Sequence, residues 1–242
     1  MALLEVEGVS KSFGALRALE GVDLSVQAKT FHGLIGPNGS GKSTLLKAIA
    51  GAHFPSSGKI MFAGQDITTT PPYERAQVGL SLKFQITSVL PELSVYDNVL
   101  LALQAGQRLW SLVSSSARRG VHADVMRSLE RFGLAKRTDD LAGTLSHGEQ
   151  QWLEIAMALA CAPKLLLLDE PTAGMSHQER RATGERLMPI KETCSLLVVE
   201  HDLDFIKDIC DITTVLDQGQ VVASGLTCQV QDNKRVRQAY LG

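Results

Sequence analysis

A glycine-rich stretch at residues 36–44 contains the residue types that bind phosphate. It reads Gly-Pro-Asn-Gly-Ser-Gly-Lys-Ser-Thr and fits the pattern G-x-x-x-x-G-K-[ST]. In this pattern the glycines let backbone N–H groups turn inward around a polyphosphate, the lysine adds a positive charge, and the next hydroxyl binds magnesium. The stretch therefore predicts a site for nucleotide phosphates in which Lys42 and Ser43 have these two roles.

The flanking sequence supplies the elements that such a loop needs. Residues 31–35 form a short apolar run typical of a strand, and residues 45–51 read as a helix that ends in glycine. A helix that begins directly after the loop points the positive end of its dipole at bound phosphate. A simple glycine turn would not need this order of strand, loop and helix, so we favour the phosphate site.

Two adjacent acids follow another apolar run. Four leucines at 165–168 precede Asp169 and Glu170, and this composition is typical of a strand buried on both faces of a parallel sheet. Ligands bind at the carboxyl ends of such strands, where a buried carboxylate needs a cation or a reacting partner. Because neighbouring strand residues point to opposite sides, we expect one acid to hold magnesium and the other to polarise water.

A further apolar run at 194–199 ends in Glu200, His201 and Asp202. If this strand is parallel to the leucine strand, His201 leaves the sheet on the same side as the acids and can donate a hydrogen bond to phosphate. A lone histidine at a strand end is more often structural or exposed, and that alternative stays open.

Residues 145–150 read Leu-Ser-His-Gly-Glu-Gln and open a helix that we expect to run to about Ala160. Ser146, followed three residues later by Glu149, matches a capping box. The exposed N–H groups at a helix start that contains glycine are also a possible second anion site. Taken by itself, the pattern favours helix capping.

Phe13 lies in the polar stretch 10–14, which we expect to form a turn. An aromatic ring gains little by burial in such a turn, so it could instead stack on a nucleotide base. The alternative is a phenylalanine at the edge of the core.

Composition limits the classes to which the chain can belong. Its 242 residues can bury a sizeable core and fit one large domain, or a core with one insertion. The net charge of −2, from 24 basic and 26 acidic residues, lacks the electrostatic signature of a nucleic-acid binder. Four cysteines without C-x-x-C spacing argue against a disulfide framework or a zinc site and favour a reducing, cytosolic compartment. No run of 18 apolar residues occurs, so we expect any membrane contact to be peripheral.

The remaining pattern suggests two strand-rich parts separated by helices. Alternating runs at 3–9 and 22–26 and a hairpin pattern at 59–67 predict antiparallel strands. Residues 86–150 read as a helical insertion, and further elements are expected towards the carboxyl end. The expected segments are helices at 96–105 and 122–132, a solvated loop at 114–120, an apolar cluster at 109–113 that a partner could cover, a hairpin at 212–225 and a helix at 232–241.

Taken in order, these motifs resemble the nucleotide-binding subunit of ABC transporters over essentially the whole chain. They are the loop at 36–44, Gln85 at the start of the helical insertion, the signature-like 145–150, the Asp169-Glu170 pair and His201. The segments 145–154, 169–175 and 240–242 are most similar to the branched-chain amino acid and urea importer branch. The resemblance implies an α/β fold with a P-loop NTPase (RecA-like) core, an antiparallel β subdomain and an inserted α-helical subdomain. One ABC ATPase domain would span 1–242, with the β subdomain and phosphate-loop part in 1–85, the helical subdomain in 86–150 and the rest of the core in 151–242.

The resemblance also implies roles for individual residues. The activity would be hydrolysis of ATP with Mg²⁺, in which Glu170 is the general base and His201 contacts the γ-phosphate. Lys42 and Gln85 would also take part in catalysis. Ser43 and Gln85 would bind the magnesium ion, and Asp169 would lie in its outer coordination sphere. ATP contacts are implied for Phe13, Gly36, Pro37, Asn38, Gly39, Ser40, Gly41, Lys42, Ser43 and Thr44. The ATP of an opposite protomer would be contacted by Ser146, His147, Gly148 and Glu149.

The implied partners are transmembrane permease subunits, a second ATPase subunit of identical or related sequence, and an extracytoplasmic substrate-binding protein in the full importer. The chain would lie at the cytoplasmic face of the membrane and bind no nucleic acid. An exporter subunit, such as one for lipopolysaccharide, is the nearest alternative. An ABC-type ATPase that acts on nucleic acid or ribosomes and a small-molecule P-loop kinase are two others.

The sequence departs from the family pattern at three positions. The signature usually reads Leu-Ser-Gly-Gly-Gln, whereas this chain has His147 and Glu149. A carboxylate at 149 is unfavourable near ATP unless its side chain caps the helix backbone instead. Ser176 stands where an aspartate is common, which leaves communication across the dimer through this loop open.

Overall fold

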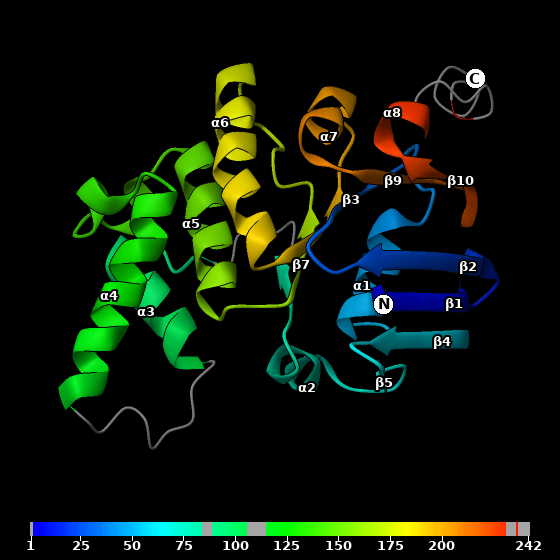
Figure 1. Ribbon diagram of the computed structural model, residues 1–242, viewed down its shortest axis with the longest axis horizontal. Coiled ribbons are helices and arrows are strands. Elements are labelled where there is room, and N and C mark those ends of the chain that lie inside the picture. Colours follow the sequence, from blue (N-terminus) through cyan, green and yellow to red (C-terminus); the bar gives the residue numbers. More distant parts are fainter. Residues whose placement is uncertain (1, 84–88, 106–114, 231–235, 237–242) are drawn as a thin grey trace.

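The described residues form two β-sheets with helices packed around them (Figure 1). The computed structural model describes residues 2–83, 89–105, 115–230 and 236. The larger sheet has the strand order β10-β9-β3-β8-β7-β6, and the smaller has the order β2-β1-β4-β5. Together with the helices, these sheets make the α/β fold that the motif order predicts.

The smaller sheet is antiparallel and covers one end of the molecule. Strand β1 (Ala2–Phe13) pairs with β2 (Leu16–Gln27) on one side and β4 (Ser57–Phe62) on the other, and β5 (Gln65–Asp66) forms the edge. This confirms the predicted antiparallel strands. Both long strands extend beyond the alternating runs in the sequence, because register shifts within the β1–β2 pair interrupt the alternation.

The larger sheet is parallel except at its β10 edge. Its strands, in chain order, are β3 (Phe31–Ile35), β6 (Leu80–Lys83), β7 (Leu165–Asp169), β8 (Ser195–Val199), β9 (Ile212–Asp217) and β10 (Gln220–Leu226). Every residue of β3, β7 and β8 is buried, which accounts for their apolar sequences. Since β8 lies between β3 and β7, the segments that follow these three strands meet at one edge.

Helix α1 (Lys42–Ala50) packs between the two sheets. Its Leu45 and Ile49 are fully buried and belong to one apolar cluster with Leu167 and Leu197 of the parallel sheet and Val6 of the antiparallel sheet. The remaining helices around the core are α2 (Pro72–Gln77), α6 (His177–Leu187), the 3-10 turn Met188–Glu192, α7 (Leu203–Ile209) and α8 (Thr227–Val230). Because α1 is held on both sides, the loop in front of it has a fixed position.

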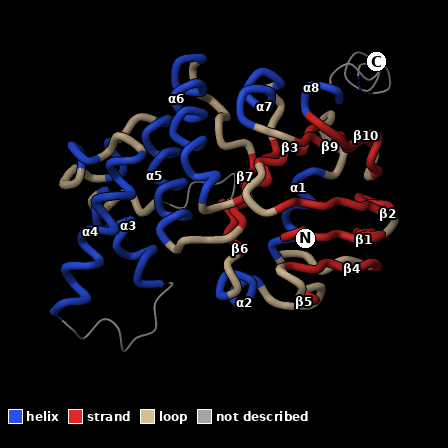
Figure 2. The backbone as a smooth tube through the Cα atoms, viewed as in Figure 1, coloured by secondary structure: helices blue, strands red, loops and turns tan. Residues whose placement is uncertain are grey.

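Helices α3 (Val95–Ala105), α4 (Ser115–Arg131) and α5 (His147–Ala160) pack together at the end of the molecule away from the antiparallel sheet (Figure 2). Two 3-10 turns, Ala135–Arg137 and Ala142–Thr144, connect α4 to α5. Fully buried side chains of these helices, including Val99, Val125 and Leu153, share one apolar cluster with the parallel sheet. The helical group is therefore packed firmly onto the core, and the boundaries at residues 85 and 150 stay predictions.

Two local predictions are wrong. The serine- and arginine-containing stretch 114–120 is not simply a loop, because α4 begins at Ser115, and arginine and alanine have enough helix propensity to extend it. Phe13 is the last residue of β1 rather than part of a turn, because the β1–β2 hairpin is tighter than expected and pairs Phe13 with Leu16. The apolar cluster at 109–113 and most of the helix predicted at 232–241 lie outside the described residues.

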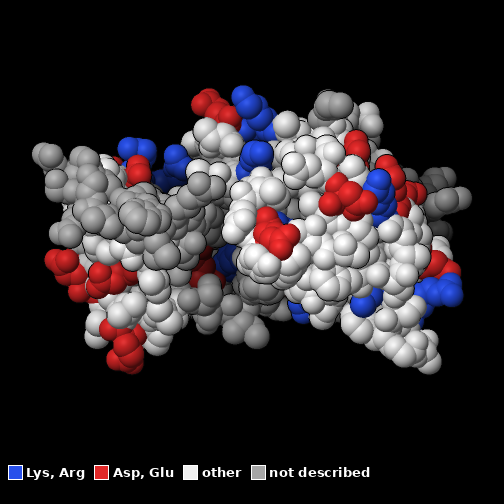
Figure 3. Space-filling model, turned by 90° about the horizontal axis from the view of Figure 1, so that it is seen from below, with Lys and Arg blue, Asp and Glu red and all other residues white. Residues whose placement is uncertain are grey.

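The surface carries charges of both signs. On the face shown in Figure 3, lysine and arginine side chains are interspersed with aspartate and glutamate and do not form one continuous basic area. The described residues on that face therefore do not form the basic stripe typical of nucleic-acid binders. Among the helices in the described ranges, none has both the length and the apolar character needed to cross a bilayer.

Candidate nucleotide-binding site

The glycine-rich loop joins the end of β3 to the start of α1. Gly36 and Gly41 have φ angles of 152° and 104°, in the region that favours glycine. A Cβ atom at Gly36 would lie 2.0 Å from the carbonyl oxygen of Leu216, and one at Gly41 would lie 2.6 Å from that of Ala18. The loop is thus confined between the backbones of β9 and β2, and a larger residue at either position would displace it.

Lys42 and Ser40 direct polar groups into this loop. Lys42 is 5% exposed, and its ammonium donates to the carbonyl oxygens of Gly36 at 2.8 Å and Pro37 at 2.9 Å. Burial lowers the pKa of Lys42, although the carboxylates of Glu170 and Asp169 at the end of β7 oppose this effect. Ser40 Oγ is buried and has no hydrogen-bond partner within the part of the chain that the structure describes. Phosphate oxygens would accept from both groups, so the loop fits a polyphosphate.

Ser43 and Asp169 bring a hydroxyl and a carboxylate together beside the loop. Ser43 Oγ donates to Asp169 Oδ1 at 3.3 Å. Burial raises the pKa of Asp169, whereas the hydrogen bond from Ser43 lowers it. A divalent cation would compensate this buried carboxylate, and oxygen atoms are the ligands that Mg²⁺ prefers. The pair therefore fits the predicted magnesium.

Glu170 does not continue the strand. Strand β7 ends at Asp169, and Glu170 has a φ of 48°, in the left-handed region that residues other than glycine rarely adopt. Its backbone N–H donates to Val199 O at 2.9 Å. We expected the two acids to point to opposite sides because side chains alternate along a strand. That explanation is wrong, because Glu170 is not part of the strand. Asp169 and Glu170 differ in environment because the chain turns sharply between them.

His201 lies against the Glu170 side chain. Its Nε2 donates to Glu170 Oε1 at 3.0 Å, and both side chains are part-exposed, at 39% for His201 and 23% for Glu170. Asp202, the next residue, caps α7 by accepting from two backbone N–H groups. The parallel arrangement of β7 and β8 thus places His201 on the same side as the acids, as the sequence predicts.

The start of α5 is a complete capping box. Glu149 N–H donates to Ser146 Oγ at 3.3 Å, and Ser146 N–H donates to Glu149 Oε2 at 2.9 Å. The other carboxylate oxygen of Glu149 accepts from Arg137 at 3.0 Å. Both the capping interpretation and the expectation that Glu149 turns back to its own helix agree with this geometry.

The same helix start touches the loop that follows Glu170. His147 Nε2 donates to Ala173 O at 3.0 Å. A Cβ atom at Gly148 would lie 2.5 Å from Glu179 Oε1, so a larger residue here would have to displace the Glu179 carboxylate of α6. The helix that carries the signature-like motif is thus in contact with the segment that carries the acids.

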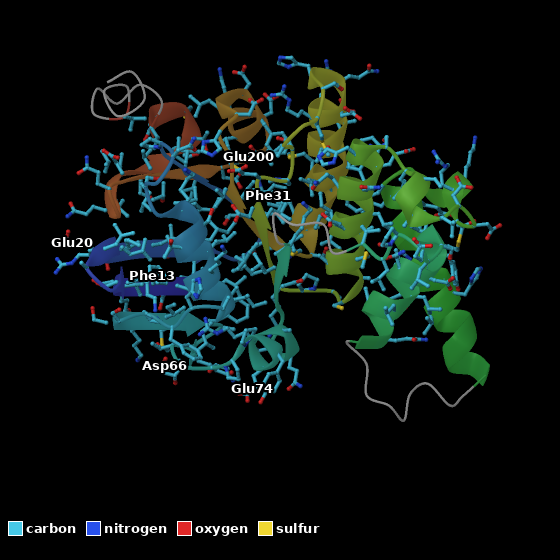
Figure 4. All side chains as sticks on the ribbon, turned by 180° about the vertical axis from the view of Figure 1, so that it is seen from behind. Phe13, Glu20, Phe31, Asp66, Glu74 and Glu200 are labelled. Atoms are coloured by element: carbon cyan, nitrogen blue, oxygen red, sulfur yellow. The ribbon has the colours of Figure 1, made fainter. Side chains whose placement is uncertain are left out.

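Phe13 presents a partly exposed ring at the end of the antiparallel sheet (Figure 4). The residue is 43% exposed, its ring makes an edge contact with His53 at 5.4 Å, and Lys11 Nζ lies 5.1 Å from the ring centroid. This exposure favours a stacking surface over a phenylalanine of the core edge.

Sequence reasoning missed a buried ionic contact next to this site. Lys83 at the end of β6 donates to Gln151 Oε1 and lies 3.2 Å from Glu154 Oε2, both residues of α5. Lys83 and Glu154 are almost completely buried. An apolar strand that ends in lysine, and an acid within an otherwise apolar helix, were the signals that could have revealed the pair. Gln85, two residues further on, lies outside the described residues.

These features define a class of protein. A glycine-rich loop between a parallel strand and a buried helix, with an acid pair after a second strand and a histidine after a third, is the arrangement of a P-loop NTPase. The fold indicates the same class as the site, because the three segments that carry these residues lie at one edge of the parallel sheet.

Comparison with known proteins narrows the class to a family. The sequence profile described as "ABC transporter" matches residues 19–173. A probable branched-chain amino acid transport ATP-binding protein of Archaeoglobus fulgidus is 34% identical over 100% of this chain and 96% of its own length. The lipopolysaccharide export system ATP-binding protein of Haemophilus influenzae is 31% identical over 100% of this chain and 98% of its own length.

A solved structure supports the assignment to the same family. The crystal structure of the ADP conformation of an ATP-binding cassette of an ABC transporter superposes with a TM-score of 0.89 at 30% identity, covering 100% of this chain and 99% of that one. The chain belongs to the ABC transporter family, and its enzymatic activity is ATP hydrolysis.

Proposed function

We propose that this chain is the ATPase subunit of an importer for branched-chain or other hydrophobic amino acids. The observation that carries the substrate class is the full-length similarity to the Archaeoglobus fulgidus protein, whose name describes transport of branched-chain amino acids. The chain would lie at the cytoplasmic face of the membrane and bind transmembrane permease subunits. A substrate-binding protein outside the membrane would supply the amino acid.

In the proposed mechanism, the loop residues bind and orient the phosphates of ATP. The Lys42 ammonium, held by two loop carbonyls, would turn to the β- and γ-phosphates when these offer stronger acceptors. Ser43, Gln85 and Asp169 are the proposed magnesium residues, of which Ser43 and Asp169 are in contact. When bound, Mg²⁺ would neutralise charge that develops on the phosphate oxygens.

Glu170 is the proposed general base for the attacking water. The carboxylate is partly accessible, and its Oε1 lies 3.0 Å from His201 Nε2. In the proposed mechanism His201 also contacts the γ-phosphate. Phosphoryl transfer to water needs positioning and charge stabilisation more than covalent chemistry, and these two residues supply both. Phe13 would stack on the adenine.

We propose further that ATP binds between two ATPase subunits. The helix start at Ser146, His147, Gly148 and Glu149 would face the nucleotide of the opposite protomer, where N–H groups and the helix dipole favour a phosphate. Dimer closure on ATP and opening after hydrolysis would move the permease.

The experiment is purification of a tagged Glu170→Gln chain from native membranes in the presence of ATP, followed by mass spectrometry of the proteins that bind to it. Recovery of permease subunits and a substrate-binding protein is the expected result, and that binding protein should bind leucine, isoleucine or valine. The Lys42→Ala chain is the matched control, because it should lose nucleotide binding.

The export alternative rests on the 31% identical Haemophilus influenzae relative, whose name describes lipopolysaccharide export. Recovery of exporter membrane subunits without a substrate-binding protein would support export. Recovery of ribosomes or DNA-processing proteins would contradict a transport function altogether.

A further inference from the structure

Glu200 is a buried carboxylate that links two segments of the site. It follows β8, is 4% exposed and lies in the interior near the middle of the molecule (Figure 4). Its Oε1 accepts from Thr172 N–H at 2.9 Å and from the Thr172 hydroxyl at 2.7 Å. Its Oε2 accepts from the backbone N–H of His201 at 3.1 Å. One side chain therefore joins the loop after Glu170 to the segment that carries His201.

The chemistry of these contacts requires a carboxylate. All three partners are donors, and an ionised carboxylate offers only acceptors. A glutamine would direct its NH₂ group at one of the donors and leave that contact unmade. Thr172 is itself 4% exposed, so water cannot easily replace a lost contact at this position.

A buried cation accompanies this carboxylate. Burial lowers the pKa of Lys83. The nearby carboxylates of Glu154, Glu200 and Asp169 have the opposite, smaller effect and raise this pKa. Burial of a carboxylate is costly unless hydrogen bonds and opposite charge compensate it, and both are provided here.

The segment held by Glu200 contains a strained residue. Five residues other than glycine have positive φ within the described ranges, and four of them, Lys29, Ala63, Ala162 and Gln218, are exposed. Glu170 is the part-buried exception, with a φ of 48°. Such a conformation persists where surrounding contacts impose it.

The contacts that hold Glu170 in this conformation come from β8 and from Glu200. Glu170 N–H donates to Val199 O at 2.9 Å, directly before Glu200 in the chain. Two residues after Glu170, the Glu200 carboxylate holds Thr172 through both its N–H and its hydroxyl. The sharp turn at Glu170 is thus fixed on both sides by adjacent residues of one segment.

We propose that Glu200 is a positioning residue for ATP hydrolysis. It fixes the positions of the Glu170 carboxylate and the His201 imidazole relative to each other and to the γ-phosphate. This inference rests on the proposed function, in which Glu170 activates water and His201 contacts phosphate. Glu200 touches neither reactant. It acts through Thr172, two residues after Glu170, and through the backbone N–H of His201.

The test compares Glu200→Gln with Thr172→Val and with the double variant. Each purified chain is assayed for kcat and KM of ATP hydrolysis and for affinity of a fluorescent ATP analogue. We expect Glu200→Gln to lower kcat at least tenfold while KM and nucleotide affinity change less than twofold, because the loop around Lys42 is untouched. Thr172→Val should act in the same direction, and the double variant should be no slower than Glu200→Gln alone.

Two controls separate positioning from loss of fold. Glu185→Gln changes an exposed glutamate of α6 and should leave all constants unchanged. Thr172→Ser keeps the hydroxyl and should restore most of the kcat that Thr172→Val loses. Should Glu200→Gln fail to fold, the comparison of Thr172→Val with Thr172→Ser decides the question alone.

Other outcomes would overturn the inference. A Glu200→Gln or Thr172→Val chain with normal kcat would contradict it, as would a parallel loss of kcat and nucleotide affinity. The Glu170→Gln chain is assayed beside them. If that chain still hydrolyses ATP, the proposed function fails, whereas an inactive Glu170→Gln with a fully active Glu200→Gln refutes only the positioning role.

Discussion

The imidazole of His32, the second residue of β3, is buried. It is 1% exposed, its Nε2 lies 2.8 Å from Thr214 Oγ1, and its Nδ1 has no hydrogen-bond partner among the described residues. Burial lowers the pKa of His32 to about 4 from the ordinary value of 6.5. The folded protein therefore resists protonation of this side chain, and the unfolded chain does not.

This difference predicts acid sensitivity. Between pH 6.5 and 4 the unfolded state binds a proton that the folded state excludes, so the free energy of unfolding should fall by up to about 3 kcal/mol as the pH drops through this window. His32→Gln removes the titrating group. Urea unfolding at pH 7.5 and pH 5 should show a smaller loss of stability in the variant than in the parent chain. Equal losses in both would contradict the assignment.

Single residues also show where sequence reasoning stops. The glycine-rich loop, the acid pair and His201 were predictable because each follows an apolar strand, and parallel strands bring such positions to one edge. The left-handed turn at Glu170 was not predictable, since nothing in the types Asp-Glu-Pro indicates a positive φ. Glu200 was overlooked although it follows a buried strand as Glu170 does, because two of its three donors belong to Thr172 in a distant loop.

At the scale of elements, α5 and α6 both begin with a capping box. Ser146 and Glu149 form the capping box of α5, and Ser176 and Glu179 form that of α6, with nearly equal hydrogen-bond distances. Only the α5 start is proposed to face ATP. The two helices therefore offer a matched comparison of capping with nucleotide contact.

We predict that Ser146→Ala and Ser176→Ala each lower the free energy of unfolding by about 1 kcal/mol, since each removes the hydroxyl that accepts from the N3 backbone N–H; Ser176→Ala also removes a hydrogen bond from the hydroxyl to Glu179 Oε2. Ser146→Ala should in addition lower the ATPase kcat severalfold at saturating ATP, whereas Ser176→Ala should not. Urea unfolding and steady-state hydrolysis measure the two effects. Equal activities of the two variants would mean that Ser146 only caps its helix.

Most elements were predictable and their ends were not. The buried strands and α5 follow from apolar runs and a capping signal. The start of α4 at Ser115 was missed because serine and arginine indicate a loop by polarity but tolerate a helix. The lengths of β1 and β2 were missed because irregular register hides alternation in the sequence.

At the scale of the whole molecule, the chain has one glycine-rich phosphate loop and a second helix start suited to an anion. These two features lie on different parts of the fold, one between the sheets and one at the start of α5. A dimer in which each helix start completes the nucleotide site of the other chain would use both. This is the central claim of the proposed function, since movement of a permease depends on it.

The most direct test is the mass of the Glu170→Gln chain in solution with and without ATP and Mg²⁺, measured by light scattering after size-exclusion chromatography. We predict a 26.1 kDa monomer without nucleotide and a particle of twice that mass with ATP, because the variant binds ATP but cannot release the dimer by hydrolysis. Ser146→Ala in the same background should weaken this dimer. A Glu170→Gln chain that stays monomeric while binding ATP, or that hydrolyses it rapidly, would contradict the account.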